Sequence, residues 1–171
     1  MFLPNHHDMT GRAKSAKLGL RQGSFLAVAL VVSSIALGLS GCQPHEGSES
    51  QLKEDVDSFA TYYYNWHFEK AAKFCTPESE KWLRYASSNV HQADIDLLHA
   101  KQQDALVEIQ DIDFGDDETS ATVNLQVTDF YQMDSIGQEA HLVQQAGFKL
   151  PMALHEGKWK VLLKELPQKV K

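Results

Sequence analysis

The spacing of hydrophobic and polar residues changes twice along the chain. Residues 24–39 form an almost wholly apolar run, SFLAVALVVSSIALGL. From Leu52 onwards, apolar residues recur every three to four positions, as they do on one face of a helix. After residue 105 they recur at every second position, as in strands with one buried face. The pattern therefore predicts a leader segment, then helices, and then a sheet.

The helical part predicts one long helix followed by three short ones. Leu52, Val56, Phe59 and Tyr63 form one apolar stripe of a helix that begins near Gln51 and ends near Asn65. Ser48 and Gln51 have the spacing of a capping box at its start. The short helices are expected near residues 68–75, after Thr76-Pro77-Glu78, and at about 90–99. Thr76 is expected to cap the second of these helices with its hydroxyl, and Pro77 suits the first helical position that follows.

The alternating part predicts four antiparallel strands, at residues 105–112, 119–129, 141–154 and from Trp159 onwards. Turns are expected at Gly115-Asp116-Asp117 and at His155-Glu156-Gly157-Lys158, and a loop over 130–138. Pro151 cannot donate to a ladder, so the third strand should lie at a sheet edge or be bulged there. Helices before strands indicate an α+β fold, with N-terminal helices packed on one face of a curved antiparallel sheet of about four strands.

The apolar run ends at Leu39-Ser40-Gly41-Cys42, which resembles the lipobox of bacterial lipoproteins. The resemblance implies a lipid on Cys42 and cleavage before it. We therefore divide the chain into a signal peptide (1–41), a flexible tether (42–50) and a single domain (51–167). An uncleaved membrane anchor is the alternative interpretation, and translation could start at Met1 or Met9. Gln43 replaces the Asp that retains enterobacterial lipoproteins in the inner membrane, so the resemblance favours the outer membrane of the cell envelope.

Charge and cysteine content narrow the classes of function. Residues 1–41 hold four Lys or Arg and one Asp, so the formal net charge of −7 for the whole chain becomes −10 once they are removed. An acidic domain argues against nucleic-acid binding. If Cys42 carries lipid, Cys75 has no intramolecular disulfide partner, and we expect it to be a small buried residue on a helix.

Two segments resemble the nuclear transport factor 2-like superfamily. Residues 62–71, YYYNWHFEKA, resemble its opening helix, corner and second helix, and residues 156–161, EGKWKV, resemble its last hairpin. The corner of that superfamily usually carries Gly-Asp, whereas Trp66-His67 stands there in this chain. The resemblance covers about residues 51–166 and is strongest to small envelope lipoproteins of a domain family of unknown function. It implies a cone-shaped fold with a pocket at its wide end, and it implies no catalytic residue.

Several side chains are candidates for the walls of such a pocket. Asp129 and Tyr131 continue the inward phase of the second strand and are the best acid/base pair. Tyr63, His99 and His141 are further wall candidates.

Aromatic residues are candidates for the rim of the pocket, and two histidines have a spacing that bears on metal binding. Tyr62 and Trp66 are candidates for the rim of a ligand or partner surface, because amphipathic rings suit both. His91 and His99 are eight residues apart with no evident third ligand, so we expect no metal site. No cofactor-binding motif is present.

The sequence leads to three hypotheses. The first is a lipid-anchored envelope protein, non-catalytic, that binds a small apolar ligand or an envelope partner protein. The alternative is an enzyme of the isomerase or dehydratase type that uses an acid/base pair in the cone. A third hypothesis is a structural role in which an exposed sheet face pairs in a homodimer.

Overall fold

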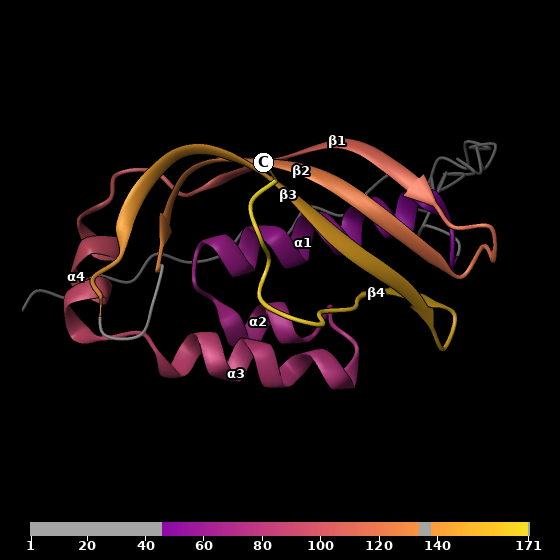
Figure 1. Cartoon of the computed structure of the whole chain (residues 1–171), viewed down its shortest axis with the longest axis horizontal. Helices are drawn as coiled ribbons and strands as arrows, with labels where there is room; N and C mark the ends of the chain where they lie inside the picture. Colours follow the sequence, from indigo (N-terminus) through magenta and orange to yellow (C-terminus); the bar gives the residue numbers. More distant parts are fainter. Residues whose placement is uncertain (1–45, 134–137, 171) are drawn as a thin grey trace, which may run out of the picture. The chain divides into compact units, whose positions relative to one another are not determined.

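The computed structural model of the chain describes residues 46–133 and 138–170. The predicted signal peptide, Cys42 and most of the predicted tether lie outside the described residues. Within them, four helices and a short 3-10 helix precede four strands. The predicted α+β fold, with helices packed on a curved antiparallel sheet, is confirmed (Figure 1).

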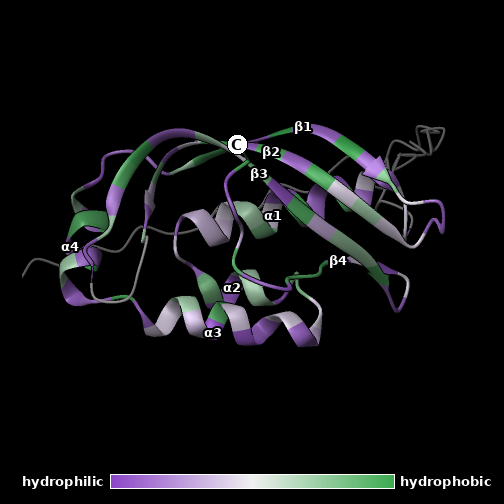
Figure 2. Cartoon of the chain, viewed as in Figure 1, coloured by the Kyte–Doolittle hydropathy of each residue, from purple (hydrophilic) through white to green (hydrophobic). Residues whose placement is uncertain are grey.

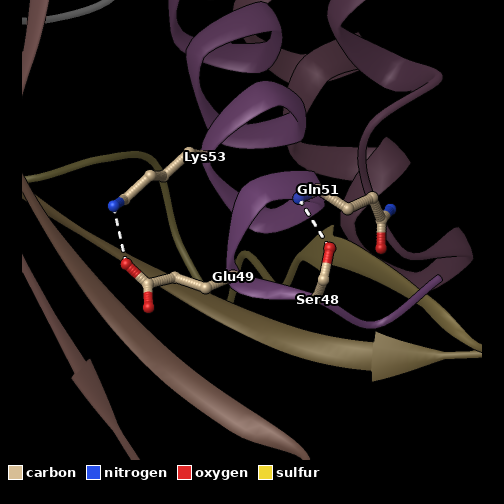
Figure 3. Close-up of polar contacts among 4 residues, drawn as sticks. All are labelled: Ser48, Glu49, Gln51 and Lys53. Carbon is tan, nitrogen blue, oxygen red and sulfur yellow. Dashed lines mark hydrogen bonds and ion pairs between the residues drawn. The ribbon is translucent and has the colours of Figure 1, made fainter. Parts of the chain in front are cut away.

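The first helix, α1 (Glu49–Tyr64), begins slightly earlier than expected. The Ser48 Oγ accepts a hydrogen bond from the Gln51 N–H at 3.2 Å, as the capping-box spacing predicts (Figure 3). The Gln51 side chain does not complete the box, because its Oε1 accepts from the Gly47 N–H at 3.0 Å instead. The Trp159 indole N–H also donates to the Gly47 carbonyl, at 3.0 Å. These bonds hold the start of α1 against the last hairpin.

Three short helices and one 3-10 turn follow: α2 (Phe68–Ala72), η1 (Pro77–Ser79), α3 (Glu80–Ser88) and α4 (Gln92–Ala100). The prediction that Thr76 caps a helix was wrong, because its hydroxyl pairs with the Ser79 hydroxyl at 2.9 Å. The buried Ser79 Oγ also accepts from the Leu163 N–H at 2.7 Å and lies 3.2 Å from the Val161 carbonyl. The two hydroxyls therefore join the helical layer to the end of the sheet.

The sheet is a meander in the order β1-β2-β3-β4, with every neighbouring pair antiparallel. Its strands are β1 (Leu106–Phe114), β2 (Ser120–Gln132), β3 (His141–His155) and β4 (Lys158–Val161). The predicted last hairpin is confirmed: Glu156 and Gly157 both have positive φ, 52° and 80°, as a two-residue type I′ turn requires. β2 runs on to Gln132, into the segment predicted to be a loop.

Pro151 does not place β3 at a sheet edge over its whole length, since β3 lies between β2 and β4. The prediction holds only locally. β4 pairs with β3 from Met152 onwards, so Pro151 lies immediately beyond the end of that ladder. Its carbonyl accepts from the Leu162 N–H at 2.8 Å, and its missing N–H leaves no broken pair.

The alternation of inward and outward side chains shifts by one position in β2, and it shifts beside that point in β3. Val123, Leu125 and Val127 are buried as predicted, but the next buried residue is Phe130. The prediction that Asp129 and Tyr131 continue the inward phase was wrong, because Asp129 adopts a left-handed conformation with φ 53°. β3 changes phase beside it: Val143, the partner of Phe130, packs against the core.

The same phase change leaves the side chain of Leu142, in β3, half exposed.

The core lies between α1 and the concave face of the sheet. The buried face of α1 consists of Leu52, Val56, Phe59, Ala60 and Tyr64. Figure 1 shows the sheet arching over α1, with α2 and α3 completing the helical layer. Hydrophobic and hydrophilic residues alternate along the strands (Figure 2), as one buried face requires. None of the helices in residues 46–133 and 138–170 is long and apolar enough to cross a membrane.

Candidate functional site

A cavity of about 390 Å³ lies at the C-terminal end of α1. Residues from both helices and strands, and from the chain that follows β4, form its walls. Half of the described lining residues are aromatic. The lining residues are Tyr63, Tyr64, Trp66, Phe68, Tyr85, Ala86, Asn89, Phe130, Tyr131, Gln132, Met133, Phe148, Leu166, Pro167, Gln168 and Lys169.

The inner wall of this aromatic cavity is a set of rings in mutual contact. The ring centroid of Tyr64 lies 5.3 Å from that of Phe130 and 4.8 Å from that of Phe148. Phe130 and Phe148 are 5.5 Å apart and nearly perpendicular. Tyr63 meets Tyr64 at 5.1 Å and Phe68 at 5.6 Å, both edge to face. Edge-to-face and tilted packing of this kind is favourable and fixes the ring positions, so this wall is largely preformed.

The hydroxyl of Tyr64 is the unusual polar group of this wall. Tyr64 is only 4% exposed, and its Oη has no hydrogen-bond partner among the described residues. A buried hydroxyl without a partner costs about 1–3 kcal/mol. Burial raises the pKa of Tyr64 well above its ordinary value, and burial also raises the pKa of Tyr63. Both phenols therefore stay protonated at neutral pH, and the Tyr64 O–H is a hydrogen-bond donor without a partner among the described residues.

The corner between α1 and α2 brings Trp66 to the cavity. Asn65 fixes the corner: its Oδ1 accepts from the Ala105 N–H at 2.7 Å, and its Nδ2 donates to the Ala105 carbonyl at 3.3 Å. Trp66 follows with φ 60°, in the left-handed region that favours glycine. A bulky residue held there carries strain of about 1–3 kcal/mol.

Trp66, which the sequence marks as a departure from the resembling superfamily, therefore carries an energetic penalty.

Trp66 is attached to the end of β2. Its indole N–H donates to the Tyr131 carbonyl at 3.3 Å, and the two ring centroids are 6.4 Å apart at 61°. Both residues line the cavity and both are only partly buried. The structure thus brings together Tyr63, Trp66 and Tyr131 from the sequence candidates.

The remaining candidates lie elsewhere. Asp129 is not a lining residue; its charge acts on Lys101, whose pKa is lowered by burial and raised in part by Asp104 and Asp129. His99 on α4 and His141 at the start of β3 are exposed and do not line the cavity. Tyr62 packs away from the cavity, on Phe74 at 6.0 Å. The acid/base pair proposed from sequence is therefore not assembled at the cavity.

Sequence reasoning missed the wall formed by the segment Leu163–Val170. The segment is held at its ends: the Leu163 N–H donates to Ser79 Oγ, and the Val170 N–H donates to the Gly147 carbonyl at 2.9 Å. Residues 166–169 line the aromatic cavity and also a second cavity of about 460 Å³. This segment follows the last strand and has no periodic pattern that would have placed it. Tyr85 and Asn89 were missed as well: Tyr85 lies beside the apolar stripe of α3, and Asn89 follows the last residue of that helix.

No metal site is indicated in the described part of the chain. None of its His, Cys, Asp and Glu side chains form a group of three or more that could hold a metal ion. The lone Cys75 is buried, and burial raises the pKa of its thiol to about 12. Such a thiol stays protonated at neutral pH and is a poor nucleophile.

Comparisons with known proteins give limited similarity. No family model matches the chain, and no curated protein matches it. One similar solved structure is the intermembrane space region of the chloroplast protein ARC6, at 10% identity and a TM-score of 0.39, covering 71% of this chain and 89% of that one. Another is an NTF2-like protein involved in plasmid conjugation, at 13% identity and a TM-score of 0.30, covering 70% of this chain and 49% of that one. At these TM-scores neither likeness bears on function, and the fold rests on the elements described above.

Proposed function

We propose that the protein is a lipid-anchored protein of the bacterial envelope whose aromatic cavity binds a small, mainly apolar ligand. The observation that carries this proposal is the cavity itself. Its volume of about 390 Å³ falls within the usual range of small-molecule sites, and such sites are mostly apolar with a few polar groups. The buried, unpaired Tyr64 hydroxyl is a polar group of this kind.

The side chains of the cavity suit binding better than proton transfer. Among the described lining residues, the titratable groups are tyrosines and Lys169. Since burial raises the pKa of Tyr63 and Tyr64, these phenols are poor bases at neutral pH. Asp129, the carboxylate of the alternative enzyme hypothesis, is outside the cavity wall. The geometry therefore favours a binding protein over an isomerase or dehydratase.

The lipid anchor is supported by the motif Leu39-Ser40-Gly41-Cys42. The start of α1 and Gly47 are held against the last hairpin, so few residues separate Cys42 from the folded domain. The cavity lies at the opposite end of α1, a helix of 16 residues that spans about 24 Å. In this proposal the cavity opens at the end of α1 away from the anchor.

Calorimetric titration of the whole protein in lipid nanodiscs tests the proposal. The two ligands are 2-naphthol and decahydro-2-naphthol, and empty nanodiscs are titrated in parallel to subtract partition into lipid. We expect saturable binding of at least one compound. Asn89→Trp, which adds a large ring to the cavity wall, should abolish it. The matched control Ser88→Trp adds the same ring at the exposed neighbouring position and should leave it intact. If neither compound binds, the proposal is refuted.

A further inference from the structure

We propose that the cavity selects flat aromatic molecules that carry a hydrogen-bond acceptor, and that Trp66 is the residue that determines this selection. The inference rests on the proposed function and names the class of ligand for the same cavity. Three features of the described residues carry it: the backbone at Trp66, the backbone at Asp129, and the unpaired hydroxyl of Tyr64.

The first feature is that Trp66 stays in a conformation that suits glycine. The backbone bonds of the corner do not need its side chain: the Trp66 N–H donates to the Tyr63 carbonyl at 3.0 Å, and the His67 N–H donates to the Tyr62 carbonyl at 2.8 Å. Glycine would keep both bonds and would relieve the strain of φ 60°. A strained bulky residue persists where its side chain has a use, and such residues concentrate at binding and active sites.

The second feature is that β2 is distorted at the level where it meets Trp66. Asp129 is also a non-glycine residue in the left-handed region. Its conformation turns Phe130 into the core and leaves Tyr131 beside the Trp66 indole. Two strained positions, far apart in the sequence, thus converge on one aromatic pair at the cavity. We call Trp66 and Tyr131 the ring clamp.

The ring clamp is held in place but not covered by the described parts of the fold. The indole N–H is fixed on the Tyr131 carbonyl at 3.3 Å, which orients the ring. Both side chains remain only partly buried while they line the cavity. Their aromatic surface is therefore available to a ligand, and a flat ring can pack against it edge to face or offset.

The third feature supplies the polar part of the ligand class. Tyr64 lies in the inner wall, in ring contact with Phe130 and Phe148, and its buried hydroxyl has no partner among the described residues. The Oη is almost wholly covered in the ligand-free protein, so a hydrogen bond to an oxygen or ring nitrogen on the ligand requires a small shift of the Tyr64 ring. The Phe130 and Phe148 rings beside it are apolar, so the part of the ligand that meets this inner wall should be apolar as well.

The decisive experiment compares two ligands that differ in the saturation of their rings. Flat 2-naphthol and saturated decahydro-2-naphthol share one carbon skeleton and one hydroxyl. In calorimetric titrations of the whole protein in nanodiscs, we expect 2-naphthol to bind roughly 2- to 12-fold more tightly, the equivalent of about 0.5–1.5 kcal/mol of ring–ring interaction. Trp66→Leu should reduce this ratio to near one while decahydro-2-naphthol still binds. Trp66→Phe should retain most of the preference.

A matched control separates the ring clamp from general effects of losing a tryptophan. Trp82 on α3 is partly buried but does not line the cavity, so Trp82→Leu should leave the ratio unchanged. Equal affinities in the wild type, or an unchanged ratio in Trp66→Leu, would overturn the inference and leave the binding function standing. Failure of both ligands to bind the wild type would instead overturn the proposed function.

Discussion

Removal of the Tyr64 hydroxyl should stabilise the ligand-free protein. In Tyr64→Phe the ring contacts with Phe130 and Phe148 remain, at centroid distances of 5.3 and 4.8 Å, and only an unpaired buried oxygen is lost. Leaving such a group buried costs about 1–3 kcal/mol, so we expect the free energy of unfolding to rise by about 1–2 kcal/mol. For a domain of this size each kcal/mol corresponds to roughly 3–5 °C in Tm.

Differential scanning fluorimetry of the protein in nanodiscs measures this change. Tyr85→Phe is the matched control, because Tyr85 also lines the cavity but is 43% exposed, so its hydroxyl can reach water. Its Tm should stay within about 2 °C of the wild type, since surface substitutions usually change stability by less than about 0.5 kcal/mol.

Ligand should narrow the difference in stability between the wild type and Tyr64→Phe. With saturating 2-naphthol, the wild type should gain more stability than the variant, because the variant lacks the hydrogen-bond donor at position 64. If Tyr64→Phe instead lowers the Tm of the ligand-free protein, the hydroxyl has a partner in the folded state. Our account of the cavity would then be wrong.

Three further predictions concern Cys75, Asp94 and Cys42. The pKa of the Cys75 thiol is raised to about 12 by burial, so iodoacetamide at pH 8 should modify it only after unfolding. The unfolded thiol loses its proton near pH 9, so the contribution of the buried thiol to the free energy of unfolding is intact below pH 9. It falls by up to about 1.4 kcal/mol per pH unit as the pH rises towards 12. In denaturation measured as a function of pH, Cys75→Ala should therefore lose less stability than the wild type between pH 9 and 12. Asp94 is 1% exposed and accepts from two backbone N–H groups, of His91 at 2.9 Å and Ala140 at 2.8 Å, so Asp94→Ala should lower the free energy of unfolding by about 2–4 kcal/mol and Asp94→Asn by about half as much. Cys42→Ala should abolish acylation and leave unprocessed precursor on immunoblots, and globomycin should cause the wild-type precursor to accumulate; fully processed protein in either case would contradict the lipid anchor.

The parts of the fold that the sequence predicted are those set by local pattern. α1 and the central strands bury one face each, and burial of one face imposes a period of 3.6 or 2 on the apolar residues. The last hairpin could be predicted equally well from the sequence, because Glu156-Gly157 matches the two positive φ values of its turn. Each of these elements depends on residues close together in the sequence.

The parts that were missed depend on contacts between distant residues. The inward phase of β2 shifts at Asp129 because Phe130 fills the core beside Phe148, and no local pattern encodes that choice. Asp94 carries a charged side chain, yet it is the most buried residue of α4 because its carboxylate joins the helix to Ala140. The segment after β4 is held in position by hydrogen bonds to Ser79 and Gly147, which are distant from it in the sequence.

One sequence signal for the cavity was present but could not be interpreted without the backbone. The sequence showed that Trp66 stands where the resembling superfamily usually has glycine. A tryptophan at a surface corner is unremarkable until its φ of 60° is known, because only then does the substitution carry an energetic penalty. The penalty matters because the same residue donates to Tyr131 and lines the aromatic cavity. A bulky residue at a glycine position is therefore informative when three conditions hold together: a left-handed backbone, a side chain on a cavity, and backbone hydrogen bonds that glycine would satisfy equally well. Trp66 meets all three, whereas Asp129 meets only the first, which is why Trp66 is the residue to which we assign ligand selection.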